Sequence, residues 1–214
     1  MHRNRSIAFF DEQFRRPAGA AALALNPFEE IALPYLGGEV LDFGCGLGNL
    51  AFAAARRGCT VTALDASPAA IEHIRSRAAA EVVALRVALA DLREHPLDAD
   101  YDCIVCIGLL MFFDCTTAFR VLTQLQSRVR PGGIAVVNVL VEGTTYLDMF
   151  DPAAHCLFGA SELQARFAGW LIERAETGDF AAAHGTLKRF STVVARKPES
   201  QAVGATQLES RSDR

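Results

Sequence analysis

Lysine is almost missing from this chain of 214 residues, which contains only Lys188 and Lys197. The other strong cations are arginines, and 21 Lys and Arg residues stand against 25 Asp and Glu residues, which gives a formal charge of −4. Proteins that bind nucleic acid through its phosphates usually carry a basic surplus. The charge balance therefore argues against a nucleic-acid partner.

Long apolar runs are lacking as well. The longest one, from Cys103 to Phe113, is shorter than the roughly 18 residues that a membrane-spanning helix requires. The N-terminal apolar stretch Ile7-Ala8-Phe9-Phe10 is interrupted at once by Asp11, so it does not resemble the apolar part of a secretory signal. We expect no membrane partner and a cytoplasmic location.

The 6 cysteines are scattered through apolar stretches, at positions 45, 59, 103, 106, 115 and 156. This distribution is typical of reduced, buried thiols rather than of a disulfide framework. The pair Cys103-x-x-Cys106 falls in an expected strand, where residues three apart point to opposite faces. No second Cys or His pair at zinc-ligand spacing follows, so we expect no metal site.

What the chain does contain is a regular alternation of strand and helix patterns. Strands are expected at 40–43, 60–64, 82–89, 101–107, 134–141, 170–177 and 187–195, and helices at 50–57, 68–80, 116–129 and 161–167. Such alternation predicts an α/β domain with a mostly parallel sheet, whose last two strands pair antiparallel because their link is short. We expect this domain at 39–197, after a helical or irregular segment at 1–38 and before a flexible tail at 198–214.

The first strand ends in a glycine-rich turn, Asp42-Phe43-Gly44-Cys45-Gly46-Leu47-Gly48. Alternate glycines let the backbone approach a ligand without a Cβ in the way, although such a turn can also be mere connectivity. In open α/β sheets, ligands bind beyond the carboxyl ends of the strands. The next two strands end at Asp65 and at Asp91-Leu92. Their carboxylates are expected to meet ribose hydroxyls and an adenine amino group, since Asp65 lies near the roughly 20-residue offset typical of ribose recognition.

Other nucleotide-binding patterns are incomplete. Asn49 stands where a dinucleotide turn needs a small residue, and neither Tyr-x-x-x-Lys nor Gly-Lys-Ser/Thr occurs. The carboxylate of Asp42 would repel a pyrophosphate but attract an ammonium or sulfonium group. An NAD(P)-dependent oxidoreductase is therefore a disfavoured alternative.

These motifs resemble those of the class I S-adenosylmethionine-dependent methyltransferases. The stretches that match are Asp42 to Gly48, Asp65, Asp91-Leu92, Tyr101 to Gly108, and Arg130-Pro131-Gly132-Gly133. The resemblance implies a Rossmann-like, seven-stranded, mostly parallel sheet in the order 3-2-1-4-5-7-6, with strand 7 antiparallel. It also implies S-adenosyl-L-methionine as cofactor.

The expected cofactor-binding residues follow from these motifs. Asp42 would favour the ammonium of the cofactor, Asp65 would bind the ribose, and Asp91 with Leu92 would hold the adenine. Ile107 and Gly108 would form the floor that faces the methyl group. The full expected set is Asp42, Gly44, Cys45, Gly46, Gly48, Asp65, Ala66, Asp91, Leu92, Ile107 and Gly108.

Within this superfamily the chain is most similar to the tellurite-resistance methyltransferase group, through 110–113, 158–167 and 188–197. That resemblance implies an oxyanion of tellurium or selenium, or another chalcogen compound, as methyl acceptor. The group carries a His-Arg pair in the hairpin before the last strand. This chain has His184 alone there, while Arg189 matches the arginine of the last strand. His184 and Arg189 are therefore the candidate catalytic residues.

The acceptor pocket is expected to form from 7–28, 109–115, 141–160 and 178–189, with the N-terminal segment over the active site. Its polar candidates are Gln13, Asn26, Asp114, Glu142, Tyr146, His155, His184 and Arg189. We expect a methyltransferase for a small-molecule acceptor, as a monomer or homodimer. The alternative is a catalytically idle cofactor-binding module that serves as a partner or sensor.

Overall fold

The computed structural model describes residues 5–16 and 19–199, so most of the expected flexible tail lies outside the described residues. Its described part contains one seven-stranded sheet in the order β3-β2-β1-β4-β5-β7-β6. The β7 strand is antiparallel to both of its neighbours, β5 and β6, and the fold expected from the sequence is confirmed. The strands are β1 (Glu39–Phe43), β2 (Thr60–Asp65), β3 (Arg86–Leu89), β4 (Tyr101–Ile107), β5 (Val129–Leu140), β6 (Leu171–Ala181) and β7 (Leu187–Arg196).

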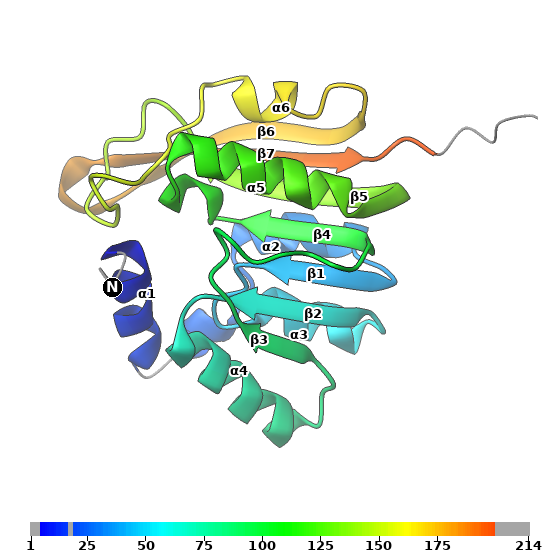
Figure 1. Ribbon diagram of the computed structural model, residues 1–214. Coiled ribbons are helices and arrows are strands. Elements are labelled where there is room, and N and C mark those ends of the chain that lie inside the picture. The colour runs from blue at the N-terminus through cyan, green and yellow to red at the C-terminus, as the bar shows by residue number, and fades with distance from the viewer. Residues whose placement is uncertain (1–4, 17–18, 200–214) are drawn as a thin grey trace, which may run out of the picture.

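Helices cover both faces of the sheet, and one more lies across the carboxyl ends of its strands (Figure 1). They are α1 (Arg5–Arg15), α2 (Pro27–Ala32), α3 (Asn49–Arg56), α4 (Pro68–Glu81), α5 (Cys115–Ser127) and α6 (Glu162–Ala165). Four short 3₁₀ turns are η1 (Ala20–Leu23), η2 (Leu33–Tyr35), η3 (Leu110–Phe112) and η4 (Ala183–Gly185). In the described part of the chain, no helix has both the length and the apolar character needed to cross a bilayer.

The core is divided by the sheet into two apolar layers. On one side, Leu122 of α5 packs with Leu41 and Cys106 of the strands. On the other side, Phe52 of α3 packs with Val40 and Cys103. The two cysteines of Cys103-x-x-Cys106 therefore point to opposite faces, as the strand periodicity predicted, and they cannot meet as a pair.

Local capping signals explain where two of the helices begin. Ser67 accepts a hydrogen bond from the backbone N–H of Ala70 (3.2 Å), and Pro68 occupies the first position of α4. Asp114 caps α5 in the same way through Thr117. The β3 strand is shorter than expected because Val82 has a φ of 54° and ends α4 instead of beginning a strand.

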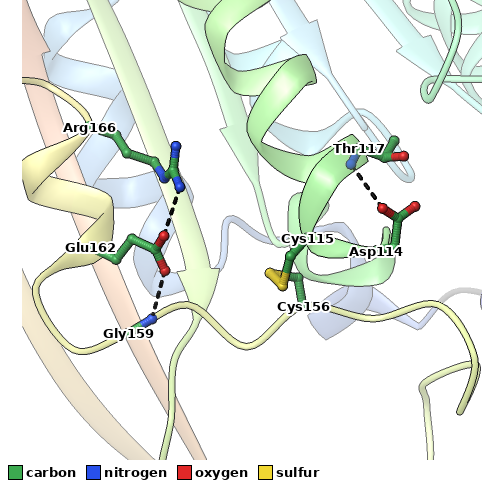
Figure 2. The surroundings of a disulfide bond; sticks show 7 residues. All are labelled: Asp114, Cys115, Thr117, Cys156, Gly159, Glu162 and Arg166. Atoms are coloured by element: carbon green, nitrogen blue, oxygen red, sulfur yellow. Dashed lines mark hydrogen bonds and ion pairs between the residues drawn. A yellow bond between two sulfur atoms is a disulfide. The ribbon is translucent and has the colours of Figure 1, made fainter.

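A disulfide joins Cys115, at the first position of α5, to Cys156 in the segment between β5 and α6. The expectation that all the cysteines are reduced thiols is therefore wrong for this pair. Figure 2 shows that the loop of Cys156 runs on to Gly159, whose N–H donates to Glu162, and Glu162 also pairs with Arg166. The two cysteines are 41 residues apart in the chain, and no sequence spacing marked them as partners.

We expect the disulfide to contribute about 2–4 kcal/mol to the free energy of unfolding, because it closes a long loop and so lowers the conformational entropy of the unfolded chain. Cys115→Ser should lower the stability measured by urea unfolding by this amount, and a dithiol reductant should lower the wild type equally. Cys59→Ser, which changes a free thiol, is the control. A wild type with the same stability with and without the reductant would contradict the bond's contribution.

Candidate functional site

A cavity of about 690 Å³ opens at the carboxyl ends of the central strands. Its volume lies within the usual range for small-molecule sites. Figure 1 shows α1 at the arrowheads of the same strands, and residues of α1 border the cavity. All of the expected cofactor residues except Gly48 line it, namely Asp42, Gly44, Cys45, Gly46, Asp65, Ala66, Asp91, Leu92, Ile107 and Gly108.

The glycine turn is held in shape by the neighbouring strand. Its Gly44 N–H donates to the carbonyl of Leu64 (2.9 Å), and its Gly46 N–H donates to Oδ2 of Asp65 (2.9 Å). Both glycines have a positive φ, 88° and 51°, which other residues rarely adopt. The turn therefore presents bare main chain to the cavity.

Gly48 is the one residue of the expected cofactor set that does not line the cavity. Its φ is 75°, and a Cβ added there would lie 2.9 Å from Cγ1 of Ile74. This glycine permits the close approach of α3 and α4 and does not border the cavity.

Asp42 is the most unusual charge of the site. Its side chain lines the cavity, yet the residue is only 6% exposed, and Oδ2 has no hydrogen-bond partner among the described residues. Burial, followed by the charges of Glu29 and Asp65, raises the pKa of Asp42 to about 8. An acidic group in this state is stabilised by a cation, which offsets both causes of the shift.

Asp65 links the turn to the start of α4. Oδ1 accepts from the Ser67 N–H (2.8 Å) while Oδ2 accepts from Gly46. Burial raises the pKa of Asp65 in spite of these hydrogen bonds, which act in the opposite direction. A carboxylate has about four acceptor positions, so two such bonds leave capacity for the hydroxyls of a ligand.

Asp91 borders the cavity but already has a partner. Its Oδ1 accepts from Nε of Arg93 (2.9 Å), and its Oδ2 accepts from Nη2 of the same arginine (2.6 Å). The hydrogen bond from the Arg93 side chain is the main reason why the pKa of Asp91 is lowered. An adenine amino group would have to share the carboxylate with Arg93, and the sequence did not indicate this competition.

The α1 helix is attached to the domain through a buried acid that no motif pointed to. Oδ1 of Asp11 accepts from Oγ of Ser67 (2.7 Å) and from the N–H of Ala69 (3.1 Å), at the N-terminus of α4. Burial would raise the pKa of Asp11, but the bonds from Ser67, Ala69 and Arg15 lower it below its ordinary value. The α1 helix is thereby placed beside the glycine turn.

The rest of the cavity wall is rich in phenylalanine. The rings of Phe10 and Phe112 are 4.9 Å apart, and Phe14 lies against Gly46, where an added Cβ would be 3.4 Å from its ring. Phe10, Phe14, Phe112 and Phe113 all line the cavity. This wall comes from the N-terminal segment and from the chain that follows β4.

Of the polar acceptor candidates, the structure brings only Gln13 and Asn26 to the cavity. Asn26 is also the N-cap of α2, where it accepts hydrogen bonds from Phe28 and Glu29. The others are placed elsewhere. Asp114 caps α5, Glu142 is exposed, the Tyr146 ring lies under the ammonium of Lys188, and His155 stacks on Phe150.

The two catalytic candidates also lie away from the cavity lining. His184 is in η4 with a φ of 57°, and the Arg189 guanidinium forms a two-pronged ion pair with Asp179 (2.7 and 2.8 Å). Arg189 also packs against Gly143. The segments 141–160 and 178–189, which were expected to build the acceptor pocket, contribute no residue to the cavity lining.

A family model described as a methyltransferase domain matches residues 40–133. This stretch is therefore similar to a methyltransferase domain of the S-adenosylmethionine-dependent class. The matched part includes β1 to β4, with the glycine turn, Asp65 and Asp91. S-adenosylmethionine is the cofactor of this class of domain.

Individual proteins agree with this family. The chain is 33% identical over 139 residues to a malonyl-[acyl-carrier protein] O-methyltransferase of Serratia marcescens, covering 61% of this chain and 52% of that one. It therefore spans about half the length of that curated relative.

Solved structures show the same fold. TehB from Haemophilus influenzae has a TM-score of 0.68 at 19% identity, over 90% of this chain and 67% of TehB. The N-methyltransferase NodS from Bradyrhizobium japonicum, solved with S-adenosyl-L-homocysteine, has a TM-score of 0.69 at 17% identity, over 92% of this chain and 100% of NodS.

We expect Asp11→Asn to loosen α1, because it removes the negative charge that faces the N-terminus of α4. Hydrogen exchange measured at pH 7 should show about tenfold faster opening of 5–16 in this variant, the effect of losing about one charge-assisted hydrogen bond. Glu12→Gln, which changes an exposed acid one residue further on, should exchange as the wild type does.

The pH dependence has a definite sign. Because the pKa of Asp11 is lowered in the folded protein, its contribution is present above the unfolded pKa of about 3.9 and is lost as the pH falls below it. If the hydrogen-exchange protection of α1 is the same in the wild type and in Asp11→Asn, the attachment of α1 through the charge of Asp11 is contradicted.

Proposed function

We propose that this protein transfers a methyl group from S-adenosylmethionine to a small-molecule acceptor, as a monomer or homodimer in the cytoplasm. The observation that carries the proposal is Oδ2 of Asp42, which is buried beside a glycine turn and has no hydrogen-bond partner in the part of the chain that the structure describes. A ligand with a cationic group would pair with the Asp42 carboxyl, and its polar atoms could bind the bare main chain of the glycine turn. S-adenosylmethionine has two cationic groups, an ammonium and a sulfonium.

The residues present fit this cofactor. Gly44 and Gly46 leave room for the methionyl part, Asp42 offers a carboxylate to its ammonium, and Asp65 offers acceptors to the ribose hydroxyls. Leu92 is buried at the adenine end. When bound, S-adenosylmethionine supplies an activated methyl group, so the protein needs no strong nucleophile of its own.

The chain's own contribution is then positioning and exclusion of water. Holding two reactants in line can lower a barrier by roughly 7–11 kcal/mol. Ile107 and Gly108 line the cavity, and the phenylalanines described above provide an apolar wall. This arrangement orients an acceptor and keeps bulk solvent away from it.

We infer that the acceptor nucleophile is a soft chalcogen, such as a thiol or selenol, rather than a tellurite-type oxyanion. An oxyanion would require a cation in the cavity. Two arginines line it: Arg93 is paired with Asp91, and the Arg16 side chain is mostly exposed to solvent, where it pairs with Glu12 (3.3 Å). A thiol has a pKa near 8.5, so a useful fraction ionises without a dedicated base.

Asp65→Ala should weaken S-adenosylhomocysteine binding by about 1–3 kcal/mol, the scale of a hydrogen bond to a charged group. Isothermal titration calorimetry measures this effect directly. Asp98→Ala, which removes an exposed carboxylate outside the cavity, is the matched control. Equal affinities in Asp65→Ala and in the wild type would refute the ribose role.

Turnover can be tested with radiolabelled S-adenosylmethionine and three acceptors: an aromatic thiol, selenite and tellurite. We expect labelled product with the thiol and much slower product formation with the two oxyanions. If the oxyanions are the better substrates, the soft-chalcogen inference is wrong. If the cofactor binds but none of these acceptors or a wider panel is methylated, the alternative of an idle cofactor-binding module is favoured.

A further inference from the structure

We propose that Glu29 of α2 is a second carboxylate of the ammonium subsite, which it forms together with Asp42. This inference rests on the proposed function, and it adds a residue that lies before the matched methyltransferase domain. If so, the short α2 helix contributes to the selectivity of the site for ligands that carry the α-ammonium group over nucleosides that lack it.

The first support is the convergence of two acids on one wall of the cavity. Both Asp42, from β1, and Glu29, from α2, line it. The backbone N–H of Ala51 acts on the pKa of Asp42 in the lowering direction, and the backbone N–H of Leu50 acts in the same way on the pKa of Glu29. Both acids therefore lie at the first turn of α3, close to each other although 13 residues separate them in the sequence.

The second support is the state of these two carboxyl groups. Oδ2 of Asp42 is buried and has no partner within residues 5–16 and 19–199, which is a costly arrangement unless a ligand provides one. Burial raises the pKa of Glu29, and the charge of Glu29 in turn contributes to the raised pKa of Asp42. Two neighbouring carboxylates destabilise each other's charge, but an ammonium between them makes the ionised state of both favourable.

The structural role of Glu29 does not require its charge. Oε2 accepts from the Asn26 N–H (2.8 Å), and Oδ1 of Asn26 accepts from the N–H of Glu29 (3.0 Å), which together form a capping box at the start of α2. Glutamine serves equally well as the third residue of this motif. Glu29→Gln therefore keeps the helix cap and removes only the negative charge.

The experiment compares two ligands on three proteins. S-adenosylhomocysteine has the α-ammonium, whereas 5′-methylthioadenosine has the same nucleoside without the amino-acid end. The proteins are the wild type, Glu29→Gln, and the matched control Glu30→Gln, which changes the neighbouring, exposed acid of the same helix. Affinities are measured by calorimetry at pH 7.

We expect Glu29→Gln to bind S-adenosylhomocysteine about tenfold more weakly, the effect of losing one charge-assisted hydrogen bond. Its affinity for 5′-methylthioadenosine should stay within about twofold of the wild type, and Glu30→Gln should match the wild type for both ligands. Asp42→Asn is the second test variant, with a selective loss in the same direction.

The pH profile separates a charge effect from a packing effect. The titratable groups that interact with Asp42 are Glu29 from α2, Asp65 from β2, Cys45 from the turn and Cys106 from β4. Both thiols have raised pKa values, so they stay neutral in this range. Wild-type affinity for S-adenosylhomocysteine should rise with pH up to about 8, as Asp42 loses its proton, and Glu29→Gln should move this rise to lower pH.

Three results would overturn the inference. The first is a Glu29→Gln variant that equals Glu30→Gln in affinity and pH profile. The second is an equal loss for both ligands, because a general disturbance of the pocket would then be the cause. The third is a wild type that does not bind S-adenosylhomocysteine, which would refute the proposed function as well and is distinguished from the first two by this loss in the unmodified protein.

Discussion

The buried carboxyl group of Asp42, near the carboxyl end of the central strand β1, is the constraint on which the rest of the site depends. Asp42 belongs to a buried strand with neighbours on both sides, Ala63 and Val105, so its side chain cannot move out to solvent. Its Oδ2 atom, which has no partner among the described residues, carries a cost when the group is ionised, and a bound cation would offset that cost. The glycine turn, the neighbouring acids and the N-terminal helices all surround this one group.

Elements outside the sheet surround the cavity as well. Asp11 anchors α1 to the N-terminus of α4, and Glu29 lies at the start of α2 beside α3. On the other side, the disulfide attaches the chain before α6 to the start of α5, and the N–H of Cys156 donates to the carbonyl of Met111 (3.0 Å). Met111 belongs to η3, which supplies Phe112 to the cavity, so the disulfide supports the apolar wall.

The features that could be predicted from the sequence are those that depend on residues close together in the chain. Strand and helix alternation predicted the sheet and its antiparallel end. Asp65 was found because it ends an apolar run, and Asp42 because it lies two residues before the glycine turn. Glu29 and Asp11 were missed because their partners lie far away in the chain, at Asp42 and Ser67. A capping-box pattern at Asn26 to Glu29 was the only local signal for either of them.

Other departures of the structure from the sequence-based expectations arise from tertiary contacts. Arg189 forms its ion pair with Asp179 across the β6–β7 hairpin, a pairing that depends on strand register. The Cys115–Cys156 bond depends on how the chain returns to α5. Gly48 belongs to the motif but serves the packing of α3 against Ile74. A motif thus indicates which residues are constrained, while the partner of each one is decided by the fold.

The most direct measurement of the central claim is a crystal structure of the protein with S-adenosylhomocysteine. The account predicts density across the glycine turn, with the amino group within hydrogen-bond distance of Asp42 and Glu29 and the ribose against Asp65. Density that places the amino group away from both acids, or a ligand bound elsewhere on the molecule, would contradict it.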